Sequence, residues 1–369
     1  APARASGSSC GCDTCDGLFD PCCTIDGEQW KLFGQNECLK CRGVNIGGYI
    51  IQSYTYNTDN PADRFNGPVT WTDRSNEYQL NRLQMTIEKA TKSEDCCWDV
   101  GYRVDALYGT DNRFVTAADL ETRGYFTSPK WSTQRFYGLA LPQAYAELAY
   151  DDWKIKIGHF FAPCGYEGVD SIANFFPNLP YTFQYGEPFT HTGILALKKV
   201  SEELTVGGGL ITGWDNFVGD NPNLGVHTVL TRTWEDKSTL TYYQVFSNEP
   251  TLTGVFRQRY LQTLAYTVPL NEKLTSTTQS DFGYQNDALQ TGRDAHWYGL
   301  NQYLFYKISD CTSFGLRTEW FRDEDGARVG GFLGQTPSGS DRGLNLNRFG
   351  YAGNFYEITW GLNYKFNAN

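Results

Sequence analysis

Charged side chains alternate with large apolar ones along several stretches of this sequence. Arg103 and Asp105, for example, alternate with Tyr102 and Val104. Successive side chains of a β-strand point to opposite faces, so each such stretch predicts a strand with one apolar and one charged face. A charged face can set an electric field that a passing solute feels, or its members can pair and stiffen the wall. The charged residues on these predicted faces are Arg82, Arg103, Asp105, Glu147, Lys154, Lys156, Arg317, Glu319, Glu357 and Lys365.

The segment 162–190 is the longest of the expected loops and is rich in Phe and Tyr. Surface loops are usually polar, so we expect this one to be buried, either in the space that the strands enclose or against a neighbouring subunit. Inside that space it would narrow a pore, and a purely structural plug is the alternative. The acidic constriction candidates are Glu167, Asp170 and Glu187, and the basic wall that they would face carries Lys154 and Lys156.

The sequence offers little that points to catalysis. Its four histidines fall on separate predicted strands, and neither a Gly-x-Ser-x-Gly nor a His-Glu-x-x-His motif occurs. The run Gly207-Gly208-Gly209 lacks the following Lys-Ser/Thr of a phosphate-binding loop and sits inside a predicted strand. We therefore predict no enzyme, no cofactor and no metal. A lipid hydrolase with a Ser and a His on adjacent strands is the weaker alternative.

Eleven cysteines predict an exported protein that is oxidised outside the cytoplasm. We expect disulfides that staple residues 1–43 to the side of the short turns, while Cys164 alone lies on the side of the long loops. The spacing of Cys12, Cys15, Cys38 and Cys41 also resembles a zinc ribbon, which we regard as the alternative. The cysteines expected to form disulfides are Cys10, Cys12, Cys15, Cys22, Cys23, Cys38, Cys41, Cys96, Cys97 and Cys311.

The elements that would position these side chains are β-strands. We expect about fourteen of them, with a range of twelve to eighteen, each about ten to fourteen residues long. Short turns and long loops alternate strictly between them, as in an up-and-down antiparallel barrel that spans a membrane. In a soluble β-sandwich, by contrast, the apolar faces would fill a thin core between two sheets. The strands are predicted to begin near residues 44, 77, 97, 135, 153, 191, 203, 224, 237, 257, 273, 295, 311 and 354.

Composition narrows the class further. The 369 residues are 15 % aromatic and carry a net charge of −11, which disfavours nucleic acid as a partner. No apolar run is long enough for a membrane-spanning helix. The opening Ala1-Pro2-Ala3-Arg4 is what we expect after removal of a signal peptide.

Several ordered motifs resemble the planctomycete-type putative β-barrel porin family of outer-membrane proteins, over about residues 44–366. The resemblance implies an outer-membrane channel and leaves its solute open. The motifs are Leu141-Pro142-Gln143-Ala144-Tyr145, Lys156-Ile157-Gly158-His159-Phe160, Pro163-Cys164-Gly165-Tyr166-Glu167, Tyr185-Gly186-Glu187-Pro188-Phe189-Thr190-His191-Thr192-Gly193, Gly213-Trp214-Asp215-Asn216-Phe217 and the terminal Tyr356-Glu357-Ile358-Thr359-Trp360-Gly361-Leu362-Asn363-Tyr364-Lys365.

These observations predict an all-β outer-membrane barrel over residues 44–369, preceded by a small cysteine-rich periplasmic segment, residues 1–43. We expect a porin that passes small hydrophilic solutes or ions by passive diffusion. The alternative is a structural or adhesion barrel with a plugged lumen, whose loops or periplasmic segment bind partners. An even strand count places both termini in the periplasm. The aromatic stripes contact outer-membrane lipid and leave room for a homo-oligomer, of which a trimer is the form expected.

Overall fold

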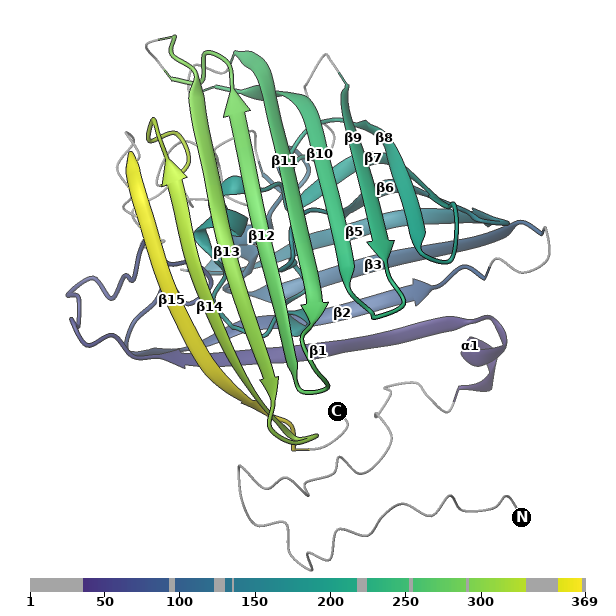
Figure 1. Ribbon diagram of the computed structural model, residues 1–369, viewed down its shortest axis with the longest axis horizontal. Helices are drawn as coiled ribbons and strands as arrows, with labels where there is room; N and C mark the ends of the chain where they lie inside the picture. Colours follow the sequence, from purple (N-terminus) through teal and green to yellow (C-terminus); the bar gives the residue numbers. More distant parts are fainter. Residues whose placement is uncertain are drawn as a thin grey trace, which may run out of the picture.

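One antiparallel sheet dominates this computed structural model, which describes residues 36–92, 97–122, 130–134, 136–217, 224–251, 255–289, 292–329 and 351–366. Its fourteen long strands each pair with the next long strand along the chain, and the sheet curls around a central space (Figure 1). Its path consists of β1 (Val44–Thr55), β2 (Glu77–Lys89), β3 (Asp99–Gly109), β5 (Tyr137–Tyr150), β6 (Trp153–Phe161), β7 (Thr190–Lys199), β8 (Leu204–Ile211), β9 (Gly225–Thr233), β10 (Thr239–Pro250), β11 (Phe256–Pro269), β12 (Leu274–Gln285), β13 (Ala295–Lys307), β14 (Thr312–Asp323) and β15 (Gly353–Tyr364).

These fourteen strands confirm the predicted fold class, and each begins within two residues of the predicted start. The sequence did not predict the short strand β4 (Ser132–Gln134), which pairs with β5. The short helical elements are α1 (Glu37–Cys41), α2 (Asn112–Val115), η1 (Ser171–Ala173) and the π-helical turn η2 (Thr182–Gly186). Among the described residues, no helix is long and apolar enough to cross a membrane.

The short turns are tight where the sequence provides residues that tolerate them. Tyr150 of β5 pairs with Trp153 of β6, so only Asp151 and Asp152 form the turn. Asp151 has a φ of 51°, in the left-handed region that Asp adopts more readily than most residues. A two-residue turn of this kind matches the twist of the strands and fixes their register.

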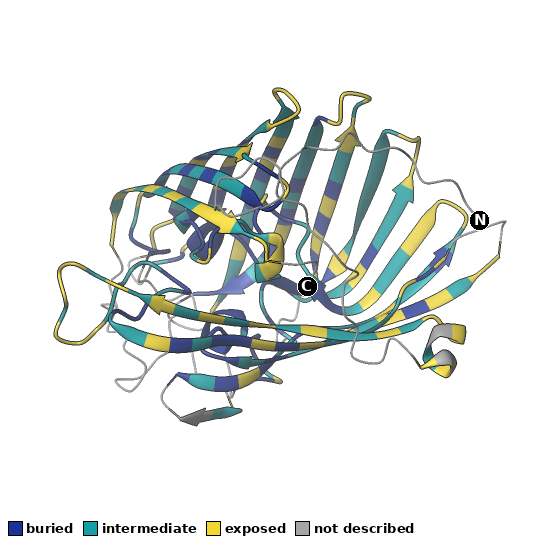
Figure 2. Ribbon diagram, turned by 90° about the horizontal axis from the view of Figure 1, so that it is seen from below, coloured by how far each residue is buried: buried dark blue, intermediate teal, exposed yellow. Residues whose placement is uncertain are grey.

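The pattern of burial is inverted relative to a soluble protein. Apolar side chains on the outer face of β15 are largely exposed, with Ile358 at 74 % and Trp360 at 69 %. Arg82 and Arg317 on the inner faces of β2 and β14 are instead fully buried. Figure 2 shows the alternation of exposed and buried residues along the strands. An apolar exterior around a polar interior is what a lipid environment requires of a sheet.

The core lies between the inner face of the sheet and the long loops that fold onto it. One cluster of buried residues joins Trp297 and Phe321 of the sheet to Tyr185 of the loop 162–190. A second cluster joins Leu107 of β3 to Trp71 and Phe183, which come from two different loops. The loop 162–190 is therefore part of the core, as its aromatic residues predict, and η2 packs on β12 and β13 (Figure 1).

The strand pairing that would close the predicted barrel, between the first and the last strand, differs from the expectation. Among the described strands, β1 and β15 are the ends of the path and no ladder pairs them. The loop 162–190 contacts both edges instead, because Tyr49 of β1 donates a hydrogen bond to Asp170 and Asn178 donates one to Glu357 of β15. The interior is thus bridged by side chains of the loop between the two edge strands.

A bilayer leaves no water for unpaired backbone groups, so we predict that β1 and β15 pair with each other in lipid. Ile50 of β1 and Ile358 of β15 both lie on the apolar outer face. With Ile50→Cys, oxidation in nanodiscs should yield a cross-linked peptide with a cysteine introduced at Tyr356, Ile358 or Trp360, since neighbouring strands bring such positions within disulfide reach.

The matched control combines Ile50→Cys with Leu300→Cys on the outer face of β13, two strands away from β15. This pair should not cross-link. If none of the three β15 positions gives a cross-linked peptide, the two edges do not meet.

Candidate pore constriction

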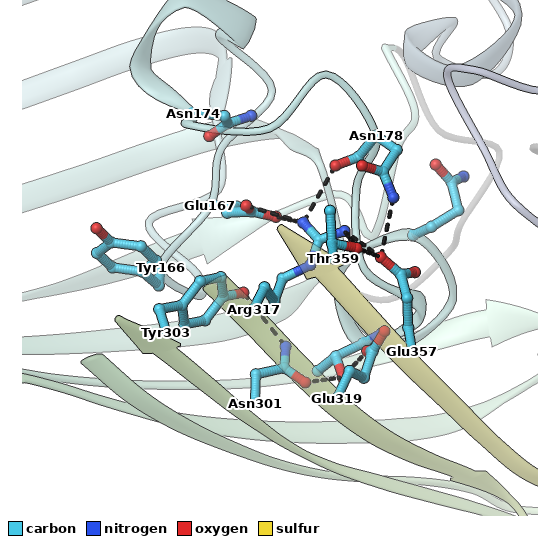
Figure 3. Close-up of polar contacts among 12 residues, drawn as sticks. Tyr166, Glu167, Asn174, Asn178, Asn301, Tyr303, Arg317, Glu319, Glu357 and Thr359 are labelled. Carbon is cyan, nitrogen blue, oxygen red and sulfur yellow. Dashed lines mark hydrogen bonds and ion pairs between the residues drawn. The ribbon is translucent and has the colours of Figure 1, made fainter. Parts of the chain in front are cut away.

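Arg317 of β14 is the centre of a polar cluster inside the sheet (Figure 3). Its Nη1 donates to both carboxylate oxygens of Glu167, at 3.0 and 2.9 Å, and to the carbonyl of Asn178 at 3.1 Å. Its Nη2 donates to Glu357 Oε1 of β15 at 2.6 Å. The guanidinium also lies over the ring of Phe176, 5.1 Å from its centroid. A buried guanidinium with two carboxylates and a carbonyl fixes this part of the loop against the wall.

Glu319, two residues further along the inner face of β14, holds the start of η2. It accepts hydrogen bonds from the backbone N–H groups of Tyr181 at 2.8 Å and Thr182 at 2.6 Å. The Thr182 hydroxyl donates to Glu319 as well, and its oxygen lies 3.0 Å from Asn301 Oδ1 of β13. The carboxylate therefore satisfies amide groups that the first turn of a helix leaves without partners.

The other end of the sheet binds the same loop through Arg82 of β2. Arg82 Nη1 donates to the carbonyl of Val169 at 2.8 Å, and its Nε donates to Asp111 at 3.2 Å. Next to it, the hydroxyl of Tyr49 donates to Asp170 Oδ1 at 2.7 Å. The four residues from Glu167 to Asp170 are thus held from both edges of the sheet.

Glu187 is buried near the end of the loop, and within the described part of the chain no ion pair joins it to a cation. Gln279 Nε2 of β12 donates to it at 2.5 Å. Gly165 passes directly over the carboxylate, because a Cβ at that position would lie 2.4 Å from Glu187 Oε2. Burial, with the Asp281 carboxyl beside it, holds the pKa of Glu187 well above its usual range. Burial likewise raises the pKa of Glu167 to about 7, although Arg317 opposes the shift.

A second set of inward charges stays in contact with solvent, on β2, β3, β5 and β6 and on the loop. The side chains of Arg103, Asp170 and Glu88 are 24 %, 27 % and 32 % exposed. Glu147 of β5 is half-buried beside its cross-strand neighbour Lys156, and Lys154 is exposed. Exposed charges of this kind can act on a solute in the lumen.

The predicted inward charges therefore divide into two groups by burial. Arg82, Asp105, Glu167, Glu187, Arg317 and Glu319 are buried and hold the loop or the wall, whereas Arg103, Glu147, Lys154, Lys156 and Asp170 remain accessible. Glu357 is half-buried and pairs with Arg317, and Lys365 is exposed. The prediction that the acidic loop residues face Lys154 and Lys156 was wrong. Glu167 pairs with Arg317, Glu187 bonds to Gln279, and Asp170 bonds to Tyr49, since the loop turns toward β12–β15 and β1.

Three residues of the candidate constriction were not identified from the sequence: Tyr49, Trp297 and Glu88. Tyr49 and Trp297 resemble the many other aromatic residues of the strands, yet Trp297 Nε1 donates to the carbonyl of Gly186 in the loop at 3.0 Å. Glu88 bonds to Arg103 across the β2–β3 pair. Its alternation with apolar neighbours on β2 is the signal that could have identified it.

The described cysteines only partly follow the predicted pairing. Cys164 is free and buried, as predicted, and Cys311 is disulfide-bonded. Cys38, Cys41 and Cys97 are free and exposed, which contradicts the prediction for them. A count of cysteines on one side does not bring two sulfurs into the narrow geometry that a disulfide needs. Cys10, Cys12, Cys15, Cys22, Cys23 and Cys96 lie outside the described residues.

An all-β sheet with an apolar exterior and a charged interior that is narrowed by an inward loop defines the class of outer-membrane channel proteins. The chain belongs to the family described as putative beta-barrel porin-2, OmpL-like, whose model matches residues 43–369. The resemblance to a β-barrel porin family is thereby confirmed, and the chain is a porin of the bacterial outer membrane. No curated protein matches the chain.

Several solved structures resemble this chain at low sequence identity. The channel DcaP of Acinetobacter baumannii has a TM-score of 0.48 at 10 % identity, over 78 % of this chain and 82 % of that one. OccAB4 of the same organism has a TM-score of 0.44 at 15 % identity, over 88 % and 77 %. An anion-selective porin from Comamonas acidovorans has a TM-score of 0.38 at 10 % identity, over 77 % and 90 %.

The buried pair of Arg317 and Glu167 leads to a first prediction about the loop. Arg317→Gln leaves the buried Glu167 and the half-buried Glu357 without their cation, so we expect a loss of about 3–5 kcal/mol in unfolding free energy. The double variant with Glu167→Gln should lose less than the sum of the two single variants. Urea unfolding in detergent measures this. The control Arg232→Gln breaks an exposed pair with Glu203 and should change stability by about 1 kcal/mol or less.

If Arg317→Gln is as stable as the control, the loop does not depend on this cluster.

Glu187 leads to a prediction about pH. In the unfolded chain this carboxyl ionises near 4.5, whereas the folded protein holds the proton to higher pH. Its contribution to stability is therefore fully present below pH 4.5 and is lost as pH rises through the folded pKa. Glu187→Gln should match the wild-type thermal midpoint in acid and exceed it progressively as pH rises. Parallel curves for the two proteins across the whole range would contradict the assignment.

Proposed function

We propose that the porin is a passive diffusion channel for small hydrophilic solutes or ions, with the loop 162–190 as its constriction. The observation that carries this proposal is the division of the inward charges. The buried set fixes the loop inside the sheet, while the exposed set around Arg103 and Asp170 lies beside it and contacts solvent. Charges at a narrow, water-filled passage discriminate between solutes by sign and size.

The second candidate is a structural barrel with a plugged lumen. The burial of the loop favours this function. Arg82, Arg317 and the aromatic rings around them are closed to solvent where they contact the loop. Single-channel recordings in planar bilayers distinguish the two functions. Stable conductance steps from folded protein support the channel, and folded protein without any conductance supports the plug.

Lipid hydrolysis finds little support in the surroundings of the four histidines. His159 and His191 are buried against Thr192 and Tyr243, and His227 contacts a backbone carbonyl. His296 on the outer side lies 3.6 Å from Asp325. None of these contacts provides the Ser–His hydrogen bond that a nucleophile would need.

The exposed charges lead to a prediction about selectivity. Asp170→Lys should shift the reversal potential in a salt gradient toward anion selectivity, and Arg103→Glu should shift it toward cations, because both side chains contact the lumen. The matched control Glu202→Lys makes the same charge change in a short turn, on a side chain that is 91 % exposed. Reversal potentials that change equally in the control and in Asp170→Lys would remove the loop from the ion path.

We further propose that the short turns and both termini lie in the periplasm and that residues 1–43 are held there through Cys311. The disulfide of Cys311 supports this proposal, because the other four described cysteines are free and none of them is its partner. Non-reducing peptide mapping should find Cys311 linked to a cysteine between residues 10 and 23. A link to Cys96, or a free Cys311 thiol, would contradict the attachment.

The oligomeric state is a separate proposal. Exposed aromatic and aliphatic side chains on the outer face of β15, such as Tyr356 and Ile358, offer a surface for self-association, with a trimer as the expected form. Chemical cross-linking of the detergent-solubilised protein tests it, and a monomer at every protein concentration would contradict it.

A further inference from the structure

A cavity of about 440 Å³ lies at the short-turn end of the lumen. Residues of the loop form one side of it, and the ends of β12–β15 with their short turns form the other. The volume lies in the range of sites that enclose a small organic molecule. Its lining combines aromatic rings with lysine side chains, chiefly Tyr166, Phe175, Phe305, Lys273, Lys307 and Lys365.

The aromatic side of the cavity is a fixed surface. The rings of Tyr166 and Phe175 lie 6.1 and 5.1 Å from that of Phe305, and Tyr166 is 39 % exposed. Both loop residues are held by their backbones, because Gln279 accepts from the Tyr166 N–H and Asn363 donates to the Phe175 carbonyl. An aromatic ring of a ligand can stack on such a surface at little cost in side-chain entropy.

Glycine at position 315 makes room for this surface. A Cβ there would lie 2.4 Å from the ring of Phe175, so any other residue would push the ring aside. The inner face of β14 thus leaves space for Phe175 beside the cavity.

The charged side of the cavity is basic, in a chain whose net charge is −11. Lys307 pairs with Asp310. Lys273 and Lys365 are exposed, and no ion pair joins either of them to a carboxylate within the part of the chain that the structure describes. Two glutamates also line the cavity. The charge of Glu167 is already balanced by Arg317, so Glu272 is the one lining carboxylate that would oppose an anion. The ammonium groups are therefore available to an anion.

We propose that this cavity is a binding site for anionic solutes that carry an aromatic ring, such as aromatic carboxylates. The ring stacks on the surface of Tyr166, Phe175 and Phe305, and the carboxylate meets the ammonium groups of Lys273 and Lys365. The inference rests on the proposed function in one respect, since a channel supplies the route by which the solute passes the site.

Isothermal titration of the folded, detergent-solubilised protein with benzoate tests the site directly. We expect saturable binding, with acetate and benzyl alcohol each weaker by about tenfold or more because one offers only the charge and the other only the ring. The double variant Lys273→Gln and Lys365→Gln should weaken benzoate binding by about tenfold, or about threefold for each lysine. Phe175→Leu should weaken it independently of the lysines.

The matched control is Lys237→Gln, which removes a lysine from another short turn and should leave the affinity unchanged. Equal benzoate affinity in the wild type and the double lysine variant would overturn the site, as would benzoate binding no tighter than acetate. Conductance of the same wild-type preparation without benzoate tests the channel separately. A conducting protein that does not bind benzoate refutes only the cavity proposal, and benzoate binding by a protein that does not conduct refutes only the channel.

Discussion

The fully buried guanidinium of Arg317 constrains the rest of the interior. A buried cation is tolerated only when carboxylates and carbonyls surround it. Of these partners, the neighbouring strand β15 provides only Glu357. The loop provides the remaining partners, Glu167 and the carbonyl of Asn178. Arg82, at the other end of the sheet, is buried in the same way and also needs hydrogen-bond partners. It donates to the carbonyl of Val169 in the loop. Two arginines on opposite ends of the strand path thus bind loop residues only two positions apart, and this arrangement places the loop inside.

Fixing the loop also decides which charges a solute can feel. Charges that hold the loop are buried and are engaged by their partners, so they act on the structure rather than on the passage. Arg103 of β3, Glu147 of β5 and Lys154 and Lys156 of β6 retain solvent contact. Asp170 of the loop, 3.8 Å from Arg103, lies at the margin between the two groups. The porin therefore separates its structural charges from its selective ones by burial, although both kinds occupy the same faces of similar strands.

Much of the fold follows from the sequence because the lipid exterior and charged interior impose a period of two on nearly every strand. Tyr356, Ile358 and Trp360 alternate with Glu357 and Thr359, and β15 begins within two residues of its predicted position. The aromatic content of 162–190 also predicted its burial. Its partners could not be predicted, because the pairing of Glu167 with Arg317 joins residues 150 positions apart and depends on the path of the loop in space. Cys38, Cys41 and Cys97 show the same limit, since their number and side did not make them pair. Whether β1 and β15 meet, which they do not among the described strands, likewise depends on the curvature of the whole sheet, and local alternation does not encode that curvature.

The central claim is that the loop 162–190, held by the buried arginines, sets the width of the channel. Single-channel conductance in planar bilayers tests it most directly, when the wild type is compared with a variant in which residues 168–186 are replaced by a short Gly-Ser linker. The account predicts stable steps for both proteins and a clearly larger conductance for the shortened one. Equal conductance of the two folded proteins would contradict it, because the loop would then lie outside the path of the ions.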